Sequence, residues 1–348
     1  MKTIKVNNFK AAILYKSKAD LQIKEIYTQD YLDYGQILVK MIYSSICGTQ
    51  VKEIDAVQGR DKYLPHLLGH EGVAEIIEIG PGVKKVKKND IVVLHWRKGS
   101  GIESATPKYF YRGKVINAGY VTTFNEKAIV SENRVTRITA KIDLSVAPLF
   151  GCSLTTGFGI IRNNAKLGIG QSILIFGLGN IGIFATLGSQ LQSANPIVGI
   201  DIDQKKINFA KKYGLQKGFL YDESTYSQIV KIYPNLFDFV LDTTGNNKVI
   251  EMCYNLTKPN GKTILAGVPN VKHKTKIYTL PLHFGREITG SHGGDTQPDN
   301  DINDYINILY KKKVNLKKFI FKEFKFSEIN KAIKLFRKGV NGKLLLKF

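Results

Sequence analysis

Apolar and polar residues alternate over short distances in the first 150 residues of the chain. The segments 36–41 and 72–80 are typical, and turn-forming residues such as Gly80-Pro81-Gly82 separate such segments from one another. Short alternating runs bounded by Gly and Pro predict β-strands with one buried face. We therefore expect this part of the chain to form a small, irregular β-barrel or sandwich.

From about residue 153 the pattern changes to apolar strand, glycine-rich turn, helix and strand again. Residues 172–176 form a nearly continuous apolar run, which is typical of a strand that is buried on both faces. Because strands alternate with helices, we predict an α/β fold with a parallel, doubly wound sheet. Further strands are expected over 197–200, 237–241, 262–266 and 287–289, with helices over 204–213 and 246–256.

The remaining C-terminal residues are too few to form a domain of their own, so we expect them to pack back onto the first domain. Their pattern predicts a helix over 304–312, a strand over 319–326, a helix over 327–338 and a final strand over 343–348.

With 348 residues, the chain is long enough for two compact domains with separate cores. We predict a β-rich domain over 1–152, a doubly wound domain over 153–292, and a segment over 293–348 that completes the first domain. No linker rich in Pro, Ser or Gly separates these parts.

The chain carries a net charge of +22, from 51 basic and 29 acidic residues. Such an excess can indicate nucleic acid or an anionic membrane surface as a partner. Only two dense basic runs occur, 84–88 and 311–318, and the other charges are scattered. We favour a solvated surface as the explanation, a field that attracts a phosphorylated substrate next, and nucleic-acid binding last.

No segment predicts a membrane span or a secretory signal. The most apolar stretch, 173–187, is interrupted by glycines and is too short to cross a bilayer. The first residues lack the apolar core of a signal peptide, so we expect a cytosolic protein. Three cysteines in such a chain do not make a disulfide framework, and the useful question is whether any of them binds metal.

A glycine motif follows the strand predicted over 172–176. It reads Gly177-Leu178-Gly179-Asn180-Ile181-Gly182 and opens a predicted helix, whose free N–H groups would face the phosphates of a dinucleotide. Asp201 ends the next predicted strand, where a carboxylate would accept hydrogen bonds from the adenosine ribose. Since a carboxylate there repels a 2′-phosphate, we predict NAD rather than NADP.

Four residues in the first part of the chain have the chemistry of a metal site. Cys47, His70, Glu71 and Cys152 supply two thiolates, an imidazole and a carboxylate, which suit a catalytic zinc ion with one open position. His70 and Glu71 are adjacent, and neighbours on a regular strand point to opposite faces. One of the two is therefore expected to be a conditional or supporting ligand, and Glu71 is the weaker candidate. A lone cysteine is more often a small buried hydrophobe, so spacing alone leaves metal binding open.

Taken together, these motifs resemble the zinc-dependent alcohol and polyol dehydrogenases of the medium-chain dehydrogenase/reductase superfamily. The resemblance rests on Cys47-Gly48-Thr49, Gly69-His70-Glu71-Gly72, the segment 151–157, the glycine motif and Gly267-Val268-Pro269. It implies a GroES-like catalytic domain, a Rossmann domain and a homodimer or homotetramer. It also implies that zinc polarises the substrate oxygen while Thr49 takes the hydroxyl proton and a hydride passes to NAD.

The resemblance further implies a set of cofactor contacts beyond the glycine motif and Asp201. Ser291 and Gly293 would offer backbone groups to the nicotinamide carboxamide, and Lys343 would contact the pyrophosphate. The remaining expected cofactor contacts are Lys206, Thr243, Ala266 and Val268.

The sequence departs from the family at three places. The segment 95–104 contains no cysteine where many relatives bind a second, structural zinc, so we predict one catalytic zinc only. Lys52 stands where many members have a histidine of the proton relay, which implies an altered or shorter route. Gln50 replaces the usual aspartate beside the ligand Cys47, so the support of His70 is expected to differ.

The cysteine-free segment suggests the class of substrate. By analogy, Trp96 would line the substrate site beside His95 and Arg97. Its basic residues and its Trp suit an anionic or highly hydroxylated substrate, such as a sugar phosphate, a polyol phosphate or a nucleotide-linked sugar. The alternative is that these residues only fold the segment or form an oligomer contact.

Two roles stay open for His292: a proton donor or substrate contact near the nicotinamide, or a structural histidine in a turn. Two other functions also remain in competition. One is a reductase of the same fold that works without zinc, and the other is a non-catalytic NAD- or nucleic-acid-binding protein.

Overall fold

The computed structural model describes residues 1–6, 8–270 and 272–348. The chain divides into two compact units, one made of Met1–Cys152 with Gln297–Phe348 and the other of Ser153–Thr296. The boundaries predicted from the sequence lie after residues 152 and 292, and the second of these is four residues before the division in the structure.

A seven-stranded sheet forms the centre of the first unit. Strand β20, from the C-terminal segment, pairs antiparallel with β5, so that Leu345 lies opposite Ser45. A strand from the C-terminal segment thereby lies inside a sheet whose other strands come mostly from the N-terminal part of the chain. The order is β12-β8-β7-β5-β20-β19, with β11 paired to β5. The strands are β5 (Gln36–Ser45), β7 (Glu71–Ile79), β8 (Ile91–His95), β11 (Lys127–Ser131), β12 (Val135–Arg137), β19 (Ile320–Lys325) and β20 (Lys343–Lys347).

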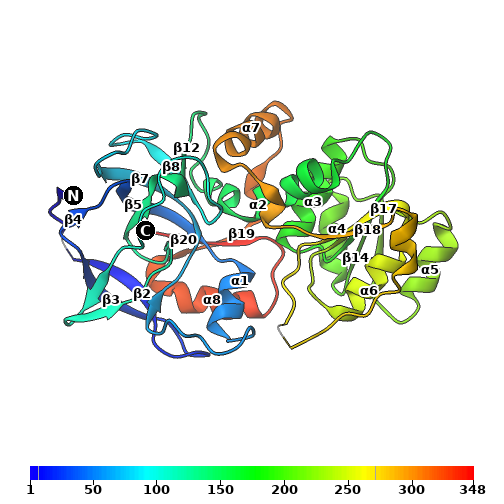
Figure 1. Cartoon of the computed structure of the whole chain (residues 1–348), viewed down its shortest axis with the longest axis horizontal. Helices are drawn as coiled ribbons and strands as arrows, with labels where there is room; N and C mark the ends of the chain where they lie inside the picture. Colours follow the sequence, from blue (N-terminus) through cyan, green and yellow to red (C-terminus); the bar gives the residue numbers. More distant parts are fainter. Residues whose placement is uncertain (7, 271) are drawn as a thin grey trace. The chain divides into compact units, whose positions relative to one another are not determined.

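Two helices cover part of this unit's core. Helix α1 (Gly48–Ile54) and helix α8 (Ile329–Arg337) lie side by side in Figure 1, and buried residues of both belong to one apolar cluster. Val51 and Ile54 of α1 pack there with Ile333 of α8. Burial of these side chains fixes the position of α1, which begins directly after Cys47.

Further strands of the first unit form two smaller sheets. One has the order β10-β9-β3-β2-β6, and the other pairs β1 with β4. Their bounds are β1 (Lys2–Thr3), β2 (Phe9–Leu14), β3 (Gln22–Thr28), β4 (Tyr31–Leu32), β6 (His66–Leu67), β9 (Tyr109–Tyr111) and β10 (Lys114–Ile116). The prediction of a β-rich first domain agrees with this architecture.

The second unit holds a six-stranded sheet in which every pair is parallel, with the order β15-β14-β13-β16-β17-β18. The chain order runs outward from β13 in one direction and then in the other, so the helices before and after this reversal cover opposite faces of the sheet. The predicted doubly wound sheet is confirmed (Figure 1). The strands are β13 (Ile173–Phe176), β14 (Ile197–Asp201), β15 (Lys217–Leu220), β16 (Phe237–Asp242), β17 (Thr257–Leu265) and β18 (Glu287–Gly290). The helices are α2 (Ser153–Gly159), α3 (Asn180–Leu191), α4 (Gln204–Lys211), α5 (Thr225–Ile232) and α6 (Asn247–Asn255).

The helix predicted over 304–312 begins earlier in the structure. Helix α7 spans Pro298–Lys311, with Pro298 in its first turn and Asp299 and Asp301 also there. A proline at the start and acidic residues in the first turn stabilise a helix N-terminus. Periodicity missed this first part because its residues are mostly polar. In the described ranges, no helix is long and apolar enough to cross a membrane.

Candidate active site

The first unit brings together three of the four predicted metal ligands. Cys47 caps the N-terminus of α1, His70 directly precedes β7, and Cys152 follows a short 3₁₀ turn, Ala147–Gly151. The ligand atoms of these three residues all lie within 4.8 Å of one another. The two sulfur atoms are 3.9 Å apart, and two thiolates bound to one tetrahedral zinc at about 2.3 Å would be roughly 3.8 Å apart.

The histidine of this cluster has an unsatisfied nitrogen. His70 Nε2 is buried and has no hydrogen-bond partner among residues 1–6, 8–270 and 272–348. Buried polar atoms nearly always have a partner, so an orphaned imidazole nitrogen beside two thiols calls for an explanation. A zinc ion satisfies all three groups, and the donor set therefore fits this metal.

The two thiols are inequivalent. A hydrogen bond from Cys152 lowers the pKa of Cys47 well below its usual value, and the positive charges of Lys343 and His70 lower it further. The same sulfur–sulfur contact, together with burial, raises the pKa of Cys152 well above its usual value. Cys47 is therefore the more acidic thiol of the pair, and binding of one metal by both sulfur atoms would release thiol protons.

Glu71 lies beside the cluster in a buried ion pair. Its Oε1 accepts a hydrogen bond from Lys343 Nζ, and both side chains are almost completely buried. Burial raises the pKa of the Glu71 carboxyl, and the Lys343 ammonium opposes this shift. Glu71 Oε2 has no hydrogen-bond partner within the described part of the chain. One carboxyl oxygen is thus committed to Lys343, and the other is the atom that a conditional ligand would use.

In the second unit, the glycine motif forms the turn between β13 and α3. Gly177 has φ +85°, a backbone conformation that residues with a Cβ rarely adopt. Gly182 lies so close to the Gly177 carbonyl oxygen that a Cβ at position 182 would clash with it. At Gly179, a Cβ would meet no atom within 4 Å. The outer glycines are therefore required by the turn itself, whereas the space at Gly179 suits close approach of a ligand to the backbone.

Asp201 connects this turn to the end of β14. Its Oδ2 accepts a hydrogen bond from Leu178 N at 2.7 Å, and Lys206 Nζ lies 3.8 Å from its Oδ1. Thr243, after β16, donates a hydrogen bond from its hydroxyl to the Gly177 carbonyl at 2.9 Å. These three predicted cofactor residues therefore gather around the glycine turn at the carboxyl ends of the parallel strands, where ligands of such sheets bind.

Two family models match the chain and together span about two thirds of it. One, described as an alcohol dehydrogenase GroES-like domain, matches residues 33–140, and the other, described as a zinc-binding dehydrogenase, matches residues 180–311. The chain belongs to the zinc-dependent alcohol dehydrogenase family of the medium-chain dehydrogenases. It is accordingly an oxidoreductase of the alcohol dehydrogenase type, with a GroES-like and a Rossmann domain, as predicted.

Individual relatives are similar over nearly their whole length. Alcohol dehydrogenase-like 2 of Arabidopsis thaliana is 28% identical over 362 residues, which cover 95% of this chain and 94% of the relative. The crystal structure of benzyl alcohol dehydrogenase from Acinetobacter calcoaceticus has a TM-score of 0.88 at 23% identity, covering 99% and 100% of the two chains. Acetophenone reductase from Geotrichum candidum, in complex with NAD, has a TM-score of 0.80 at 18% identity, covering 99% and 98%.

The alcohol dehydrogenase motif around Cys47 continues into α1. Thr49 is exposed on the first turn of this helix. Gln50, in place of the family's aspartate, is buried; its Oε1 accepts a hydrogen bond from Gly69 N, and its Nε2 donates one to Glu53 Oε2 at 2.9 Å. Gln50 therefore ties the helix that carries Cys47 to the backbone just before His70.

His95, predicted at the substrate site, has its contacts inside the first unit. It ends β8 and is buried, with Nδ1 2.7 Å from the Arg97 carbonyl oxygen and Nε2 3.0 Å from Thr136 Oγ1. Both ring nitrogens are thus engaged inside the protein, which favours a structural role over a substrate contact. Trp96 and Arg97, which follow, are half-buried, and the Arg97 guanidinium carbon lies 6.0 Å from the Trp96 ring centroid.

Protonation of His95 should make the protein sensitive to acid. Burial lowers the pKa of His95 to about 4, whereas an unfolded chain titrates near its ordinary value of about 6.5. The stability that neutral His95 contributes is present above about pH 6.5 and is lost as the pH falls towards 4. We expect this loss to be on the order of 3 kcal/mol. Urea unfolding of wild type and His95→Gln across this range will measure it, and parallel pH profiles for the two proteins would contradict it.

The cysteine-free segment after Trp96 is organised by carboxylates. Glu132 is buried, and its oxygens accept hydrogen bonds from Ile102 N at 2.9 Å and from Lys84 N at 3.1 Å. Asp299 of α7 accepts a hydrogen bond from the Ser100 hydroxyl at 2.7 Å. Lys98 forms an ion pair with Glu103 at 2.8 Å, so part of the basic charge of this segment is already neutralised.

The other predicted cofactor residues follow strands of the Rossmann sheet. Ala266 and Val268 come after β17, and Ala266 N donates a hydrogen bond to the Asp242 carbonyl at 2.8 Å. Ser291 and Gly293 come after β18; the Ser291 hydroxyl donates to Asn164 Oδ1 at 2.7 Å and accepts from Gly294 N at 3.0 Å. His292 is exposed between them. The sheet thus places these residues at the edge expected for a cofactor, and their contacts with NAD stay a prediction.

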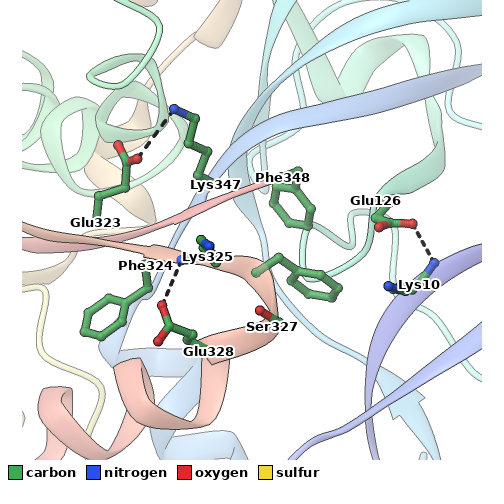
Figure 2. Close-up of a pocket in the computed structure, with 10 residues that line it drawn as sticks. Lys10, Glu126, Glu323, Phe324, Lys325, Ser327, Glu328, Lys347 and Phe348 are labelled. Atoms are coloured by element: carbon green, nitrogen blue, oxygen red, sulfur yellow. Dashed lines mark hydrogen bonds and ion pairs between the residues drawn. The ribbon is translucent and has the colours of Figure 1, made fainter.

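A separate pocket of about 700 Å³ lies in the first unit, lined by residues of the C-terminal segment together with Lys10 and Glu126 (Figure 2). Several of its carboxylates are already engaged: Glu126 accepts a hydrogen bond from the backbone N of Lys10 at 2.8 Å, and Glu323 forms an ion pair with Lys347 at 3.8 Å. None of the predicted site residues lines it, so it carries no part of the candidate active site.

The contact between Lys343 and Glu71 could not be predicted from the sequence. These residues are 272 positions apart, and no local motif connects them. Only the insertion of β20 next to β5 brings Lys343 to the buried carboxylate. The expected contact of Lys343 with the cofactor pyrophosphate stays a prediction, and its contact in the structure is with Glu71.

Proposed function

We propose that this protein is a zinc-dependent, NAD-linked dehydrogenase that interconverts an alcohol and its aldehyde or ketone. The observation that carries the proposal is the cluster of Cys47, His70 and Cys152, whose sulfur atoms have the spacing of two thiolates on one zinc. Bound there, zinc would supply Lewis-acid polarisation of the substrate oxygen. The proposed content is one catalytic zinc and no structural zinc, because residues 95–104 contain no cysteine.

The chain's own residues divide the remaining work. Thr49, two residues after Cys47 and exposed, would take the proton of the alcohol hydroxyl. Lys52 stands where many relatives have a relay histidine, so the proton would leave by an altered or shorter route. Glu71, held by Lys343, would keep its second carboxyl oxygen for a conditional contact with the metal.

NAD as the cofactor is supported by Asp201, whose carboxylate stands at the glycine turn and would repel a 2′-phosphate. The acetophenone reductase of similar fold was solved with NAD.

We expect Asp201→Asn, which keeps an oxygen acceptor for Leu178 N, to reduce the preference for NAD over NADP by at least about tenfold. Steady-state kcat/KM with both cofactors measures this ratio, and Asp222→Asn in the same unit is the control. An unchanged ratio in Asp201→Asn would count against the assignment.

For the substrate, we propose an anionic or highly hydroxylated alcohol, such as a phosphorylated or nucleotide-linked sugar or polyol. Arg97 beside Trp96 supports this class, since guanidinium binds phosphate and an indole face stacks on a sugar or base. The ion pair of Lys98 with Glu103 weakens the support from that lysine.

One experiment tests both parts of this proposal. The full chain is purified, its metal content is measured, and formation of NADH is followed across pairs of phosphorylated and neutral alcohols. Zinc at the cysteine cluster with turnover of an alcohol supports the dehydrogenase, whereas activity that persists without zinc points to a metal-independent reductase. Equal kcat/KM within each pair would overturn the anionic substrate. Salt-sensitive binding of DNA or RNA without turnover would favour the non-catalytic alternative.

We propose that the protein is a homodimer or homotetramer assembled through its Rossmann domain. Strand β18 is the edge of that sheet, and an unpaired edge is a template for a second copy. Tyr278 and Phe284, which precede this strand, are 67% and 66% exposed. Light scattering should give the mass of two or four chains, and a monomer at micromolar concentration would exclude this assembly.

A cytosolic location is proposed because a reducing environment keeps Cys47 and Cys152 available for metal.

A further inference from the structure

A second group of side chains with metal-binding chemistry lies apart from the cysteine cluster. Glu53 is on α1, Asp61 is in the loop that follows, and His66 begins β6. One ligand atom from each of these residues lies within 4.8 Å of the other two. None of the three belongs to the motifs that identify the family.

The imidazole of His66 is oriented by its other nitrogen. Nδ1 lies 3.1 Å from the Leu67 carbonyl oxygen, which can only accept a hydrogen bond, so Nδ1 carries a proton. Nε2 is thereby turned towards the carboxylates: it makes a hydrogen bond of 2.6 Å with Asp61 Oδ2, which a metal ion would replace, and it lies 4.0 Å from Glu53 Oε1. Histidines that bind metal are commonly held in this way, with one nitrogen donating to a carbonyl and the other on the metal.

Each carboxylate is held at the oxygen that faces away from His66. Gln50 Nε2 donates to Glu53 Oε2 at 2.9 Å, and Tyr63 N donates to Asp61 Oδ1 at 2.8 Å. The remaining oxygens converge on the imidazole. The three side chains are therefore fixed by hydrogen bonds from outside the group, which is the support that a metal site needs.

The charge of this group also favours a cation. The side chains of His66 and Asp61 are each only 7% exposed, and that of Glu53 is 38% exposed. Two carboxylates with one imidazole leave an excess of negative charge in a largely buried place. Burial raises the pKa of Glu53 and the nearby Asp61 carboxylate adds to this, although His66 opposes it. A divalent ion would neutralise both carboxylates, whereas a single imidazolium cannot.

We propose that Glu53, Asp61 and His66 form a second metal site, which binds a divalent transition-metal ion of the zinc type through one nitrogen and two oxygens. Nitrogen and carboxylate ligands suit such borderline ions. Ligand atoms at about 2.0–2.1 Å from a tetrahedral ion are roughly 3.3 Å apart, so Asp61 would withdraw slightly and the half-exposed Glu53 would close in. Water would fill the remaining position on the exposed side of Glu53.

This site would be joined to the catalytic cluster by one side chain. Gln50 donates to Glu53 through its Nε2 and accepts from Gly69 N, the residue before His70, through its Oε1. A bound ion would thus stiffen the segment that positions His70. By linkage, occupancy of the site would stabilise the folded protein.

Cobalt(II) distinguishes the two sites, because cobalt bound to cysteine thiolates gives strong sulfur-to-metal charge-transfer absorption and cobalt bound to His and carboxylates does not. We expect the full chain to bind two equivalents of Co²⁺, the second without charge-transfer absorption. Glu53→Gln, which keeps an oxygen for Gln50, should weaken the second site by at least about tenfold and leave the charge-transfer band unchanged. Glu25→Gln, an exposed site with the same change of charge, is the matched control.

His66→Asn gives a second, independent variant for the same measurement. Loss of the second equivalent in both variants, with both retained in Glu25→Gln, supports the site. A single equivalent of Co²⁺ in the wild-type protein overturns the proposal even where a variant fails to fold. Retention of the second equivalent at unchanged affinity in Glu53→Gln also overturns it.

Discussion

Replacing Cys152 with serine is expected to lower kcat/KM for the best alcohol substrate by at least about a thousandfold. Such a loss corresponds to about 4 kcal/mol of transition-state stabilisation, which is the scale of metal-ion polarisation of a substrate oxygen. The Sγ atoms of Cys47 and Cys152 are 3.9 Å apart, a spacing that suits two thiolates on one zinc ion. A serine hydroxyl at position 152 cannot supply the second thiolate. Metal analysis of the purified variant should show loss of zinc from the cysteine cluster, in parallel with the loss of activity.

Cys253 provides the matched control for this experiment. It is the third cysteine of the chain, buried in the apolar core of the second unit with Val240 and Leu256. Cys253→Ala should keep its zinc and its activity, because this thiol packs as a small hydrophobic side chain. Wild-type turnover in zinc-free Cys152→Ser would exclude a catalytic metal at this cluster.

Replacing Lys343 with methionine is expected to destabilise the protein by about 3–5 kcal/mol. Methionine keeps most of the volume but leaves the completely buried Glu71 carboxylate without its counter-charge. An uncompensated buried charge costs far more than the loss of an exposed ion pair, whose contribution is small. The measurement is the free energy of unfolding in urea at neutral pH, with the metal content held fixed.

The double variant Glu71→Gln/Lys343→Met separates the ion pair from packing. Since both charges are then absent, we expect most of the lost stability to return, and a double-mutant cycle gives the coupling energy. As a comparison, Lys334→Met breaks an exposed ion pair with Asp20 and should cost no more than about 1 kcal/mol. If Lys343→Met costs as little as Lys334→Met, Lys343 does not neutralise a buried charge.

Local patterns of apolar residues and turn residues predicted much of the fold. The apolar run before Gly177 and the spacing to Asp201 predicted β13, the turn and β14, because a parallel strand buried on both faces has to be continuously apolar. The predicted helix over 246–256 corresponds to α6 (Asn247–Asn255). The short β15 and α5 were not predicted, since Lys217 to Leu220 lacks a long apolar run.

The parts of the candidate site that depend on the side-chain chemistry of single residues could be predicted from the sequence. The parts that depend on the pairing of strands far apart in the sequence could not. Thiol and imidazole side chains identified Cys47, His70 and Cys152, and the structure places them together. The resemblance to the family placed His95 beside Trp96 at the substrate site, although its position at the end of an inner strand buries it. The partner of Glu71 was invisible in the sequence, because strand pairing alone decides which residue of the C-terminal segment reaches it.

The position of β20 also has a consequence for biosynthesis. The strand is synthesised after the whole Rossmann unit, yet it lies inside the sheet between β5 and β19 and brings Lys343 close to the proposed metal ligands. The Rossmann unit is continuous in sequence and is complete before then. During translation, the nascent chain would therefore hold an open N-terminal sheet edge until β20 has emerged, and that interval is when chaperone protection matters most.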